Sequence, residues 1–259
     1  MNLFIEPEYL LALQLRQLVD FDSIWNFEME WFEEPNERRG GWSGVGRVEL
    51  NLENNIKLTL FIKKQENHGR LTWLSPISGE PTFRREFKRL TFLKSADCAA
   101  PRVVFYGESK ENKKQRAILV TVALDEYRPL ESLSEDWLVK ASQTQKKKLI
   151  AEIARGLRTF HKLGLVHRAL YPKHIFIRDA DTQPAMALID LEKARYSPIF
   201  FYRAYFDLAA LNRHLLNWTK TQRLEFFKSY FGYKSLSRHP LSFFYKWFCR
   251  LIVKCSQRH

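Results

Sequence analysis

The sequence has few cysteines, no long apolar run and a deficit of acidic residues. Its three cysteines, Cys98, Cys249 and Cys255, form no CxxC pair, which predicts reduced thiols and argues against a disulfide scaffold or a structural zinc site. No apolar run approaches the roughly 18 residues that cross a bilayer, so the pattern excludes a spanning helix. Glu6 and Glu8 stand where a signal peptide carries basic residues, so we expect a cytoplasmic protein.

The composition is otherwise that of a folded protein with a strong basic excess. Hydrophobic residues make up 45% of the 259 positions, enough for a core in one large domain or two small lobes. Lys and Arg number 42 against 29 Asp and Glu, a net charge of +13. Such a balance predicts a polyanionic partner: a nucleic acid, a phosphorylated glycolipid, a nucleotide or an anionic membrane surface.

The first half of the chain has mostly strand patterns. Four of the ten glycines fall between Arg38 and Gly46, which predicts a loop. Alternating apolar residues on both sides of Asn54-Asn55 predict a hairpin, and a helix is expected from Pro81 onward. Two further strands are expected at 102–106 and 118–123.

The second half has mostly helical patterns. Apolar residues at 3.6-residue spacing predict a helix over 144–161 that Gly164 ends. Short strands are expected at 165–167, 174–177 and 185–189, and helices at 206–217, 220–230 and 240–255. The pattern predicts an α+β fold with a β-rich N-terminal lobe (1–122), which would bind nucleotide, and a helical C-terminal lobe (123–259), joined near 122–127.

Glycines are the first candidates for contact with a ligand. Gly41, Gly44 and Gly46 fall within the hairpin-like stretch 41–48, and glycines let backbone amides approach phosphate groups closely. The spacing is not GxGxxG, so a plain tight turn is the alternative.

A lysine and a glutamate follow the glycines. Lys63 ends the apolar strand Leu60-Phe61-Ile62, and a lysine there can reach nucleotide phosphates. Lys64 competes for this role, but Lys63 aligns with the lysine of the V-A-I-K pattern. Glu86, on the next predicted helix, can pair with Lys63 and hold it in place. A strand-edge lysine and a surface glutamate are the plain alternatives.

Two later segments contain candidate catalytic and metal-binding residues. His167-Arg168-Ala169 follows the long helix, and His174 stands five residues after Ala169, where the H-R-D loop of protein kinases has a metal ligand. Asp190 ends an apolar strand at the position of the D-F-G aspartate, where a carboxylate suits a hard cation. A structural histidine and a turn aspartate are the plain alternatives.

The ordered set resembles the protein kinase fold and, more closely, the lipopolysaccharide core heptose kinase family, the WaaP/InaA group. The resemblance covers about residues 30 to 215. The segments that carry it are ERRGGWSGV (37–45), FIKKQEN (61–67), PTFRREFKRL (81–90), HRALYPKHIFI (167–177) and LIDLEKAR (188–195).

This resemblance implies a bacterial cytoplasmic enzyme at the inner membrane that transfers the γ-phosphate of ATP to a heptose hydroxyl of the lipopolysaccharide inner core. By matching positions, Lys63 would bind the ATP phosphates and Glu86 would position Lys63. Asp190 and His174 would hold Mg²⁺. Asp207 would brace the catalytic loop, a structural role.

Ala169 departs from the family pattern, which has aspartate after His-Arg to orient the acceptor hydroxyl and accept its proton. Three readings remain open: a slow enzyme, an enzyme in which a neighbour such as His167 substitutes, or a pseudokinase. The pseudokinase would bind nucleotide or glycolipid in envelope assembly or a stress response without turnover. Asp179 and Asp181 are expected to be solvated turn residues rather than replacement bases.

Other functional classes fit less well. The segment 241–254 mixes aromatic and basic residues, as in a buried last helix or one that contacts the inner membrane. The charge alone would suit nucleic acid, but no helix-turn-helix, zinc-finger, RRM or KH pattern is present, so no nucleic-acid partner is expected. Small-molecule phosphotransferases related to aminoglycoside or choline kinases normally keep the aspartate that Ala169 replaces.

Overall fold

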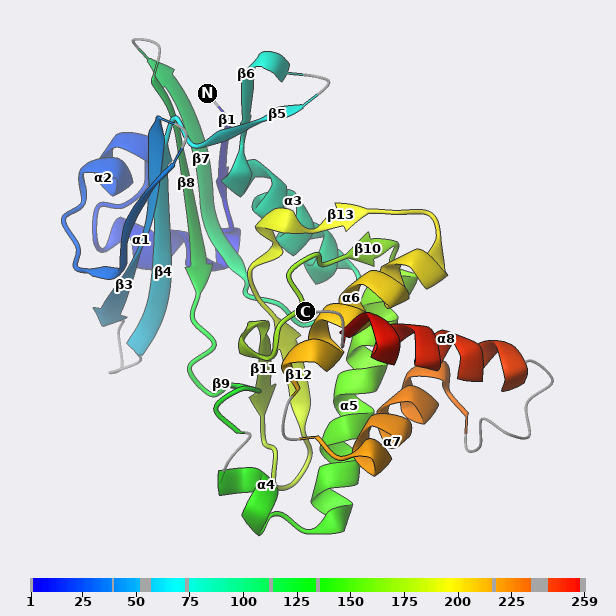
Figure 1. The fold of residues 1–259 in the computed structure, drawn as a ribbon. Coiled ribbons are helices and arrows are strands. Elements are labelled where there is room, and N and C mark those ends of the chain that lie inside the picture. The colour runs from blue at the N-terminus through cyan, green and yellow to red at the C-terminus, as the bar shows by residue number, and fades with distance from the viewer. Residues whose placement is uncertain are drawn as a thin grey trace. The chain divides into compact units, whose positions relative to one another are not determined.

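The chain forms two compact units, seen in the computed structural model of Figure 1. The first contains residues 1–94 and 101–125, and the second contains residues 95–100 and 126–259. The structure describes residues 2–38, 40–51, 57–72, 75–111, 114–133, 136–215, 218–233 and 242–256.

A six-stranded antiparallel sheet forms the frame of the first unit, in the order β1-β7-β8-β4-β3-β2. Its strands are β1 (Asn2–Ile5), β2 (Trp31–Arg38), β3 (Gly41–Asn51), β4 (Lys57–Glu66), β7 (Val103–Glu111) and β8 (Lys114–Val122). A small hairpin, β5 (Gly69–Thr72) and β6 (Ser75–Pro81), leads into helix α3 (Thr82–Ser95). Two short helices, α1 (Leu10–Gln14) and α2 (Phe21–Asn26), complete the unit.

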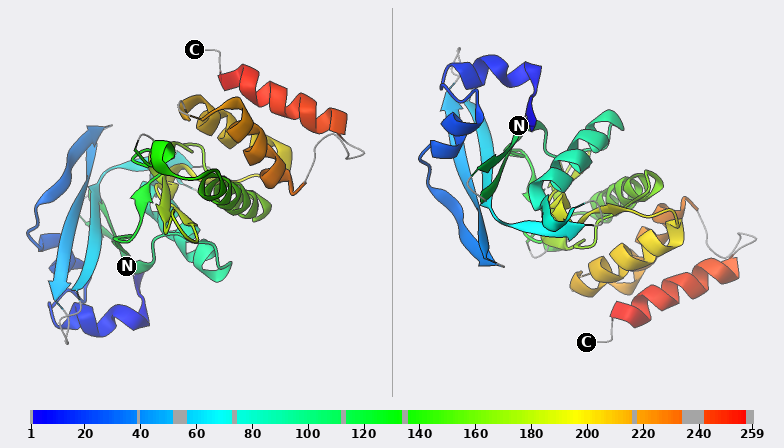
Figure 2. Two further views of the ribbon diagram at one scale, coloured as in Figure 1. Left: turned by 90° about the horizontal axis from the view of Figure 1, so that it is seen from below. Right: turned by 90° about the horizontal axis from the view of Figure 1, so that it is seen from above.

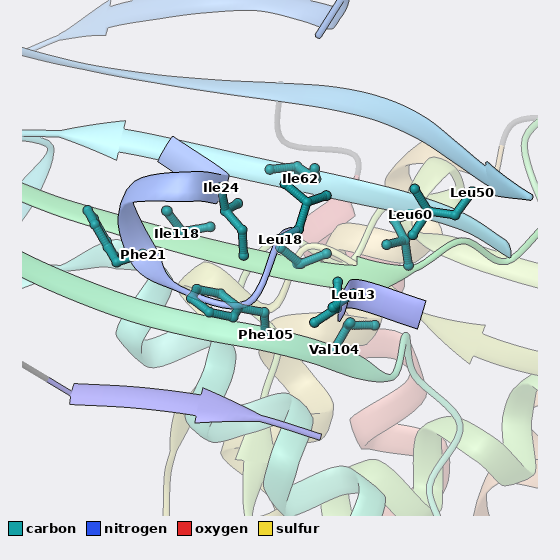
Figure 3. Packing of buried hydrophobic residues seen from close by; sticks show 11 residues of the cluster. Leu13, Leu18, Phe21, Ile24, Leu50, Leu60, Ile62, Val104, Phe105 and Ile118 are labelled. Atoms are coloured by element: carbon teal, nitrogen blue, oxygen red, sulfur yellow. The ribbon is translucent and has the colours of Figure 1, made fainter. Parts of the chain in front are cut away.

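The register of the sheet separates its side chains onto two faces, because successive residues of a strand point to opposite sides. On one face, Leu60 and Ile62 of β4 pack against Leu13 of α1 and Phe21 and Ile24 of α2 (Figure 3). On the other face lies α3, whose Phe87 ring stacks on that of Tyr106 of β7 at 4.3 Å. Lys63 and Lys64 therefore point to opposite faces.

The predicted glycine loop is wrong, because the residues from Gly41 onward form strand β3. Strands β2 and β3 are paired as far as Arg38 and Gly41. A side chain at Gly44 would overlap the ring of Trp31. One at Gly46 would overlap Met29. These glycines make room for large side chains from β2 and the segment before it, a tertiary effect that sequence composition does not reveal.

The long helix α5 (Gln143–Lys162) is the centre of the second unit. Ser142 and Gln145 form a capping box at its start, and Gly164, at φ +89°, follows its end in a conformation that suits glycine. Its buried stripe consists of Leu149, Ile150, Ile153, Ala154, Leu157 and Phe160. The helix predicted over 144–161 and its termination near Gly164 are confirmed.

Short strands and further helices surround α5. The strands are β9 (Arg128–Pro129), β10 (Leu165–Val166), β11 (Ile175–Arg178), β12 (Ala185–Leu188) and β13 (Arg195–Tyr196). The helices are α4 (Asp136–Lys140), α6 (Phe200–His214), α7 (Lys220–Phe231) and α8 (Ser242–Ser256). In both views of Figure 2, α8 lies alongside α6.

Most element predictions are confirmed, with three differences. Helix α6 begins at Phe200, six residues before the predicted start at 206. Pro81 is the last residue of β6, and α3 begins one residue later. The sequence interpretation did not anticipate several elements, namely β1, β2, β5, β6, β9, β13, α1, α2 and α4. The predicted turn at Asn54-Asn55 lies outside the described residues.

The structure also bears on two sequence predictions, one about membrane-spanning helices and one about the cysteines. Over the part of the chain that the structure describes, no helix is both long and apolar enough to cross a membrane. Cys98 and Cys249 are free thiols, as predicted, and the side chain of Cys255 is outside the described set.

Candidate functional site

An ion pair joins β4 to α3 in the first unit. Nζ of Lys63 lies 2.6 Å from Oε1 of Glu86. Glu86 is buried, and the Lys63 side chain keeps partial exposure. A short contact between a buried carboxylate and a partly exposed ammonium restricts where the lysine nitrogen lies. The lysine nitrogen is therefore held in place by Glu86, and part of the Lys63 side chain remains exposed.

Lys64 has a different role from its neighbour. Its Nζ donates to the backbone oxygens of Trp25 at 2.9 Å and of Phe27 at 2.7 Å, at the end of α2. Burial lowers the pKa of Lys64. Lys64 thus caps a helix C-terminus on the face of the sheet opposite Lys63. Of the two lysines, Lys63, the one favoured by the sequence, is the one that lies beside Glu86.

Gly41, Gly44 and Gly46 do not form a glycine loop near Lys63. Gly44 pairs with Lys64 and Gly46 with Ile62, so a side chain at either position would point to the α2 face rather than to the Lys63 face. At Gly41, a Cβ would overlap the backbone of Asn67. Packing within the unit accounts for the glycine at all three positions.

In the second unit, Asp207 of α6 holds the loop that contains His167 and Arg168. Oδ2 of Asp207 accepts a hydrogen bond from the backbone N–H of His167 at 2.6 Å, and Oδ1 accepts one from that of Arg168 at 2.9 Å. His161 of α5 approaches the same carboxylate at 3.0 Å. The carboxylate is fully buried, so it is a structural anchor for this loop.

His167 is buried and is part of the anchor rather than of an exposed site. Its Nε2 lies 3.0 Å from the carbonyl oxygen of Ile189, so Nε2 carries the ring proton and donates it. Burial lowers the pKa of His167, against the opposing effect of the Asp207 carboxylate. The ring is neutral and has no exposed surface. A substitute base for a substrate hydroxyl needs access, and His167 lacks it.

Asp190 and His174 come together at the ends of adjacent strands. Nε2 of His174 lies 3.4 Å from Oδ2 of Asp190, and both side chains retain some exposure. Nδ1 of His174 lies 2.7 Å from the carbonyl oxygen of Ala169, to which it donates. Asp190 has φ +59° and Arg168 has φ +69°. Such backbone conformations are uncommon in residues other than glycine and concentrate at functional sites.

The donor set at this point fits a divalent cation that also binds phosphate. Because Nδ1 of His174 donates to the Ala169 carbonyl, Nε2 is the ring nitrogen that faces the Asp190 carboxylate, and a neutral imidazole nitrogen beside a carboxylate oxygen is a donor pair that a metal ion can use. Among the described residues, no group of three or more His, Cys, Asp or Glu side chains could hold an ion. Mg²⁺ usually binds through one or two carboxylates, with substrate phosphates and water completing its shell.

Ala169 is buried, and its carbonyl oxygen is the acceptor for His174. The methyl group has no polar function, so the loop lacks a carboxylate at this position. Asp179 and Asp181 lie in the turn of the β11–β12 hairpin, where Arg178 pairs with Ala185. That turn is at the opposite end of the hairpin from Asp190, and both aspartates are exposed.

Sequence reasoning missed two residues that shape this site. His161 shares the Asp207 carboxylate, and its Nδ1 lies 2.6 Å from the hydroxyl of Tyr230. Tyr171 lies within the catalytic-loop segment, and its ring contacts that of His174 at 5.7 Å. A buried histidine on the apolar stripe of α5 is a signal that could have identified His161. The ring contact of Tyr171 depends on loop geometry.

Comparisons with known proteins point to one family and one fold. A family model described as the lipopolysaccharide kinase (Kdo/WaaP) family matches residues 22–230. Protein InaA of Escherichia coli (strain K12) is 29% identical over 181 residues, which are 68% of this chain and 79% of InaA. The solved structure of WaaP in complex with acyl carrier protein shares the fold, with a TM-score of 0.70. It has 23% sequence identity, and the match covers 98% of this chain and 99% of that chain.

Proposed function

Because the chain belongs to the lipopolysaccharide kinase (Kdo/WaaP) family, we propose that it binds ATP with Mg²⁺ and phosphorylates a sugar hydroxyl of the lipopolysaccharide inner core, a heptose hydroxyl in the first instance. The bond between the γ-phosphorus and the ADP oxygen breaks, and a bond from phosphorus to the sugar oxygen forms. The hydroxyl proton passes to solvent. The observation that carries this proposal is the Lys63–Glu86 ion pair.

In the first unit, Lys63 contributes the charge that binds ATP phosphates. Glu86 keeps the ammonium from folding back along the strand, and its own burial keeps the pair in one arrangement. A fixed cation stabilises the negative charge of the phosphates without reorganising at the moment of transfer. The glycines of β3 have a structural role in this proposal, because a side chain at each of these positions would overlap a neighbouring residue.

In the second unit, Asp190 and His174 hold Mg²⁺. Bound there, the ion would neutralise phosphate charge and orient the transferred group. His174 is itself positioned by Ala169, and the loop is positioned by Asp207. These contacts fix the donor atoms before any substrate binds, which is the chain's main contribution to a reaction that depends on positioning.

Ala169 makes the proposed reaction slow rather than absent. General-base assistance is worth about 10²–10⁴ in rate, and positioning with metal electrostatics accounts for most of the rest. The alternative is a pseudokinase that binds nucleotide or glycolipid in envelope assembly or a stress response. Its supporting observation is that the buried methyl of Ala169 offers no proton acceptor.

The remaining parts of the proposal concern location and partners. Residues 1–122 would act as the nucleotide-binding lobe, and residues 123–259 would supply the catalytic loop and the metal ligands. We place the protein in the cytoplasm, at the cytoplasmic face of the inner membrane. The net charge of +13 supports a phosphorylated glycolipid partner.

Phosphate transfer to a soluble acceptor tests the proposal. Purified protein is incubated with ATP, Mg²⁺ and dephosphorylated core oligosaccharide, and the sugar product is followed by mass spectrometry. We expect a slow, metal-dependent gain of one phosphate that Lys63→Met abolishes. ATP binding without transfer supports the pseudokinase, and no ATP binding overturns both readings.

A further inference from the structure

Large apolar side chains are exposed on the second unit just after the metal-binding segment. Tyr196 is 64% exposed and Ile199 is 63% exposed. Phe201 and Tyr202, at the start of α6, are exposed as well, and Trp247 of α8 is 49% exposed. These five residues are called the exposed aromatic patch below. Apolar side chains gathered in this way often mark an interaction site.

Packing between α6 and α8 brings the parts of the patch together. The ring of Phe201 contacts that of Phe248 at 5.4 Å, and Phe248 is the buried neighbour of Trp247. The two helices lie side by side in Figures 1 and 2. The patch therefore combines two segments that are far apart in the sequence.

Within the two segments that contribute the patch, the charged side chains have one sign, with Glu192 directly before the first segment. Residues 193–206 and 242–256 contain Lys193, Arg195, Arg203, Lys246, Arg250 and Lys254, and no Asp or Glu. Arg203 is buried, and the other five are exposed. Arg195 reaches the hydroxyl of Tyr202 at 3.2 Å, so a cation lies directly beside an aromatic side chain of the patch.

We propose that the exposed aromatic patch and its cations dock on the surface of an anionic lipid bilayer. Tyr and Trp side chains favour the interface between water and hydrocarbon, where their rings are buried and their polar ends are hydrated. Lys and Arg beside them are attracted to anionic headgroups, each strengthening binding by about fivefold. A partner protein with an acidic surface is the other occupant that these side chains would suit, and absence of binding to anionic vesicles would favour it.

The patch is also connected to the catalytic loop. The ring of Tyr202 lies 6.0 Å from that of Phe206, and the guanidinium of Arg168 lies 5.6 Å above Phe206. A membrane-bound glycolipid held at the patch would thus present its sugar near the loop that contains Ala169. Both this link to the acceptor and the choice of a bilayer deepen the proposed location at the inner membrane and rest on the proposed function, whereas transfer to a soluble acceptor depends on neither.

Vesicle sedimentation tests the proposal. The full chain is mixed with vesicles of phosphatidylcholine alone or with added phosphatidylglycerol, and the bound fraction is measured at low and high salt. We expect binding only to the anionic vesicles and weaker binding in high salt. Tyr196→Ser with Ile199→Ser should lower binding at least tenfold, and Lys193→Gln with Arg195→Gln should do the same.

Matched controls separate the patch from general surface properties. Leu11 is 64% exposed and Leu224 is 51% exposed, both outside the patch, so Leu11→Ser with Leu224→Ser should leave binding unchanged. Lys140→Gln with Lys147→Gln removes the same charge elsewhere and should lower binding less than the patch pair. Circular dichroism confirms that each variant is folded.

Three outcomes would overturn the proposal: no binding of the unaltered chain to anionic vesicles, equal losses in the control variants, or dimers that Ile199→Ser dissociates. The last result would assign the patch to a second copy of the chain. Transfer to soluble oligosaccharide needs no membrane, so the patch variants should retain it. A failure of docking is thereby distinguished from a failure of the kinase proposal.

Discussion

The carboxylate of Glu86 lies 2.6 Å from Nζ of Lys63, a contact that joins strand β4 to helix α3. Lys64, the next residue, points to the other face of the sheet and caps α2. The two adjacent lysines thus have different partners, so the same substitution at each position can be compared in one experiment.

Lys63→Met should weaken ATP binding by at least tenfold and also lower the melting temperature, because it removes the phosphate-binding cation and leaves the buried Glu86 carboxylate without its partner. Lys64→Met should lower stability by about 1–3 kcal/mol but leave ATP affinity unchanged, because two backbone carbonyls lose a charged donor on the other face of the sheet. Isothermal titration and thermal denaturation of both variants measure the two effects. The same loss of ATP affinity in both variants would contradict the assignment.

Asp207→Asn should destabilise the second unit by about 3 kcal/mol. The buried carboxylate accepts two backbone N–H groups, and an amide nitrogen in place of one oxygen would face a donor. Urea denaturation measures the change. Asp179→Asn, in an exposed turn at positive φ where asparagine is tolerated, is the control and should shift stability by less than about 0.5 kcal/mol.

Asp190→Asn should raise the Mg²⁺ concentration needed for tight ATP binding by at least tenfold, since it removes the only carboxylate we assign to the metal. His174→Asn should have a smaller effect, because asparagine is the usual metal ligand at that position in protein kinases. Mg²⁺ titrations at fixed ATP give both values. Asp179→Asn, in the exposed turn at the opposite end of the hairpin from Asp190, should match the unaltered chain, and an unchanged Mg²⁺ requirement in Asp190→Asn would refute the metal assignment.

Ala169→Asp should raise the turnover number about 100-fold or more, because it restores a general base next to the acceptor hydroxyl. The position is buried, so the same variant should be less stable than the unaltered chain. Turnover with core oligosaccharide and the melting temperature are measured together. Ala169→Asn has the same shape without the carboxylate, and equal gains in both variants would show that the base is not the cause.

Cys98 and Cys249 should react slowly with a thiol reagent in the folded protein. Burial raises the pKa of Cys98 to about 11 and that of Cys249 to about 12. At pH 8, less than about 1% of either thiol is thiolate at these pKa values. Absorbance with a disulfide reagent should show both thiols becoming reactive only on unfolding, and fast labelling of both in the native protein would contradict this.

Much of the candidate site was predictable from the sequence. Local periodicity was sufficient for α5 and the strands around it, and ordered motifs identified Lys63, Glu86, His174, Asp190 and Asp207. These residues lie at strand ends or on helices with clear patterns. Strand alternation explains why Lys63 and Lys64 differ.

Other features depend on tertiary contacts that no local pattern reveals. Gly44 and Gly46 were interpreted as a loop, but they are strand positions against Trp31 and Met29. His167 was a candidate base, but its side chain is fully buried and has no access to a substrate hydroxyl. Helix α6 extends upstream through aromatic residues because Phe201 packs against α8, so propensity alone placed its start too late.

The central claim is that this chain uses Lys63 to bind ATP, and one titration tests it most directly. ATP is titrated into the unaltered chain, Lys63→Met and Lys64→Met with and without Mg²⁺, and the heat of binding is recorded. The account predicts Mg²⁺-dependent binding to the unaltered chain and to Lys64→Met, and its loss in Lys63→Met. Absence of ATP binding to the unaltered chain, or full binding to Lys63→Met, would contradict it.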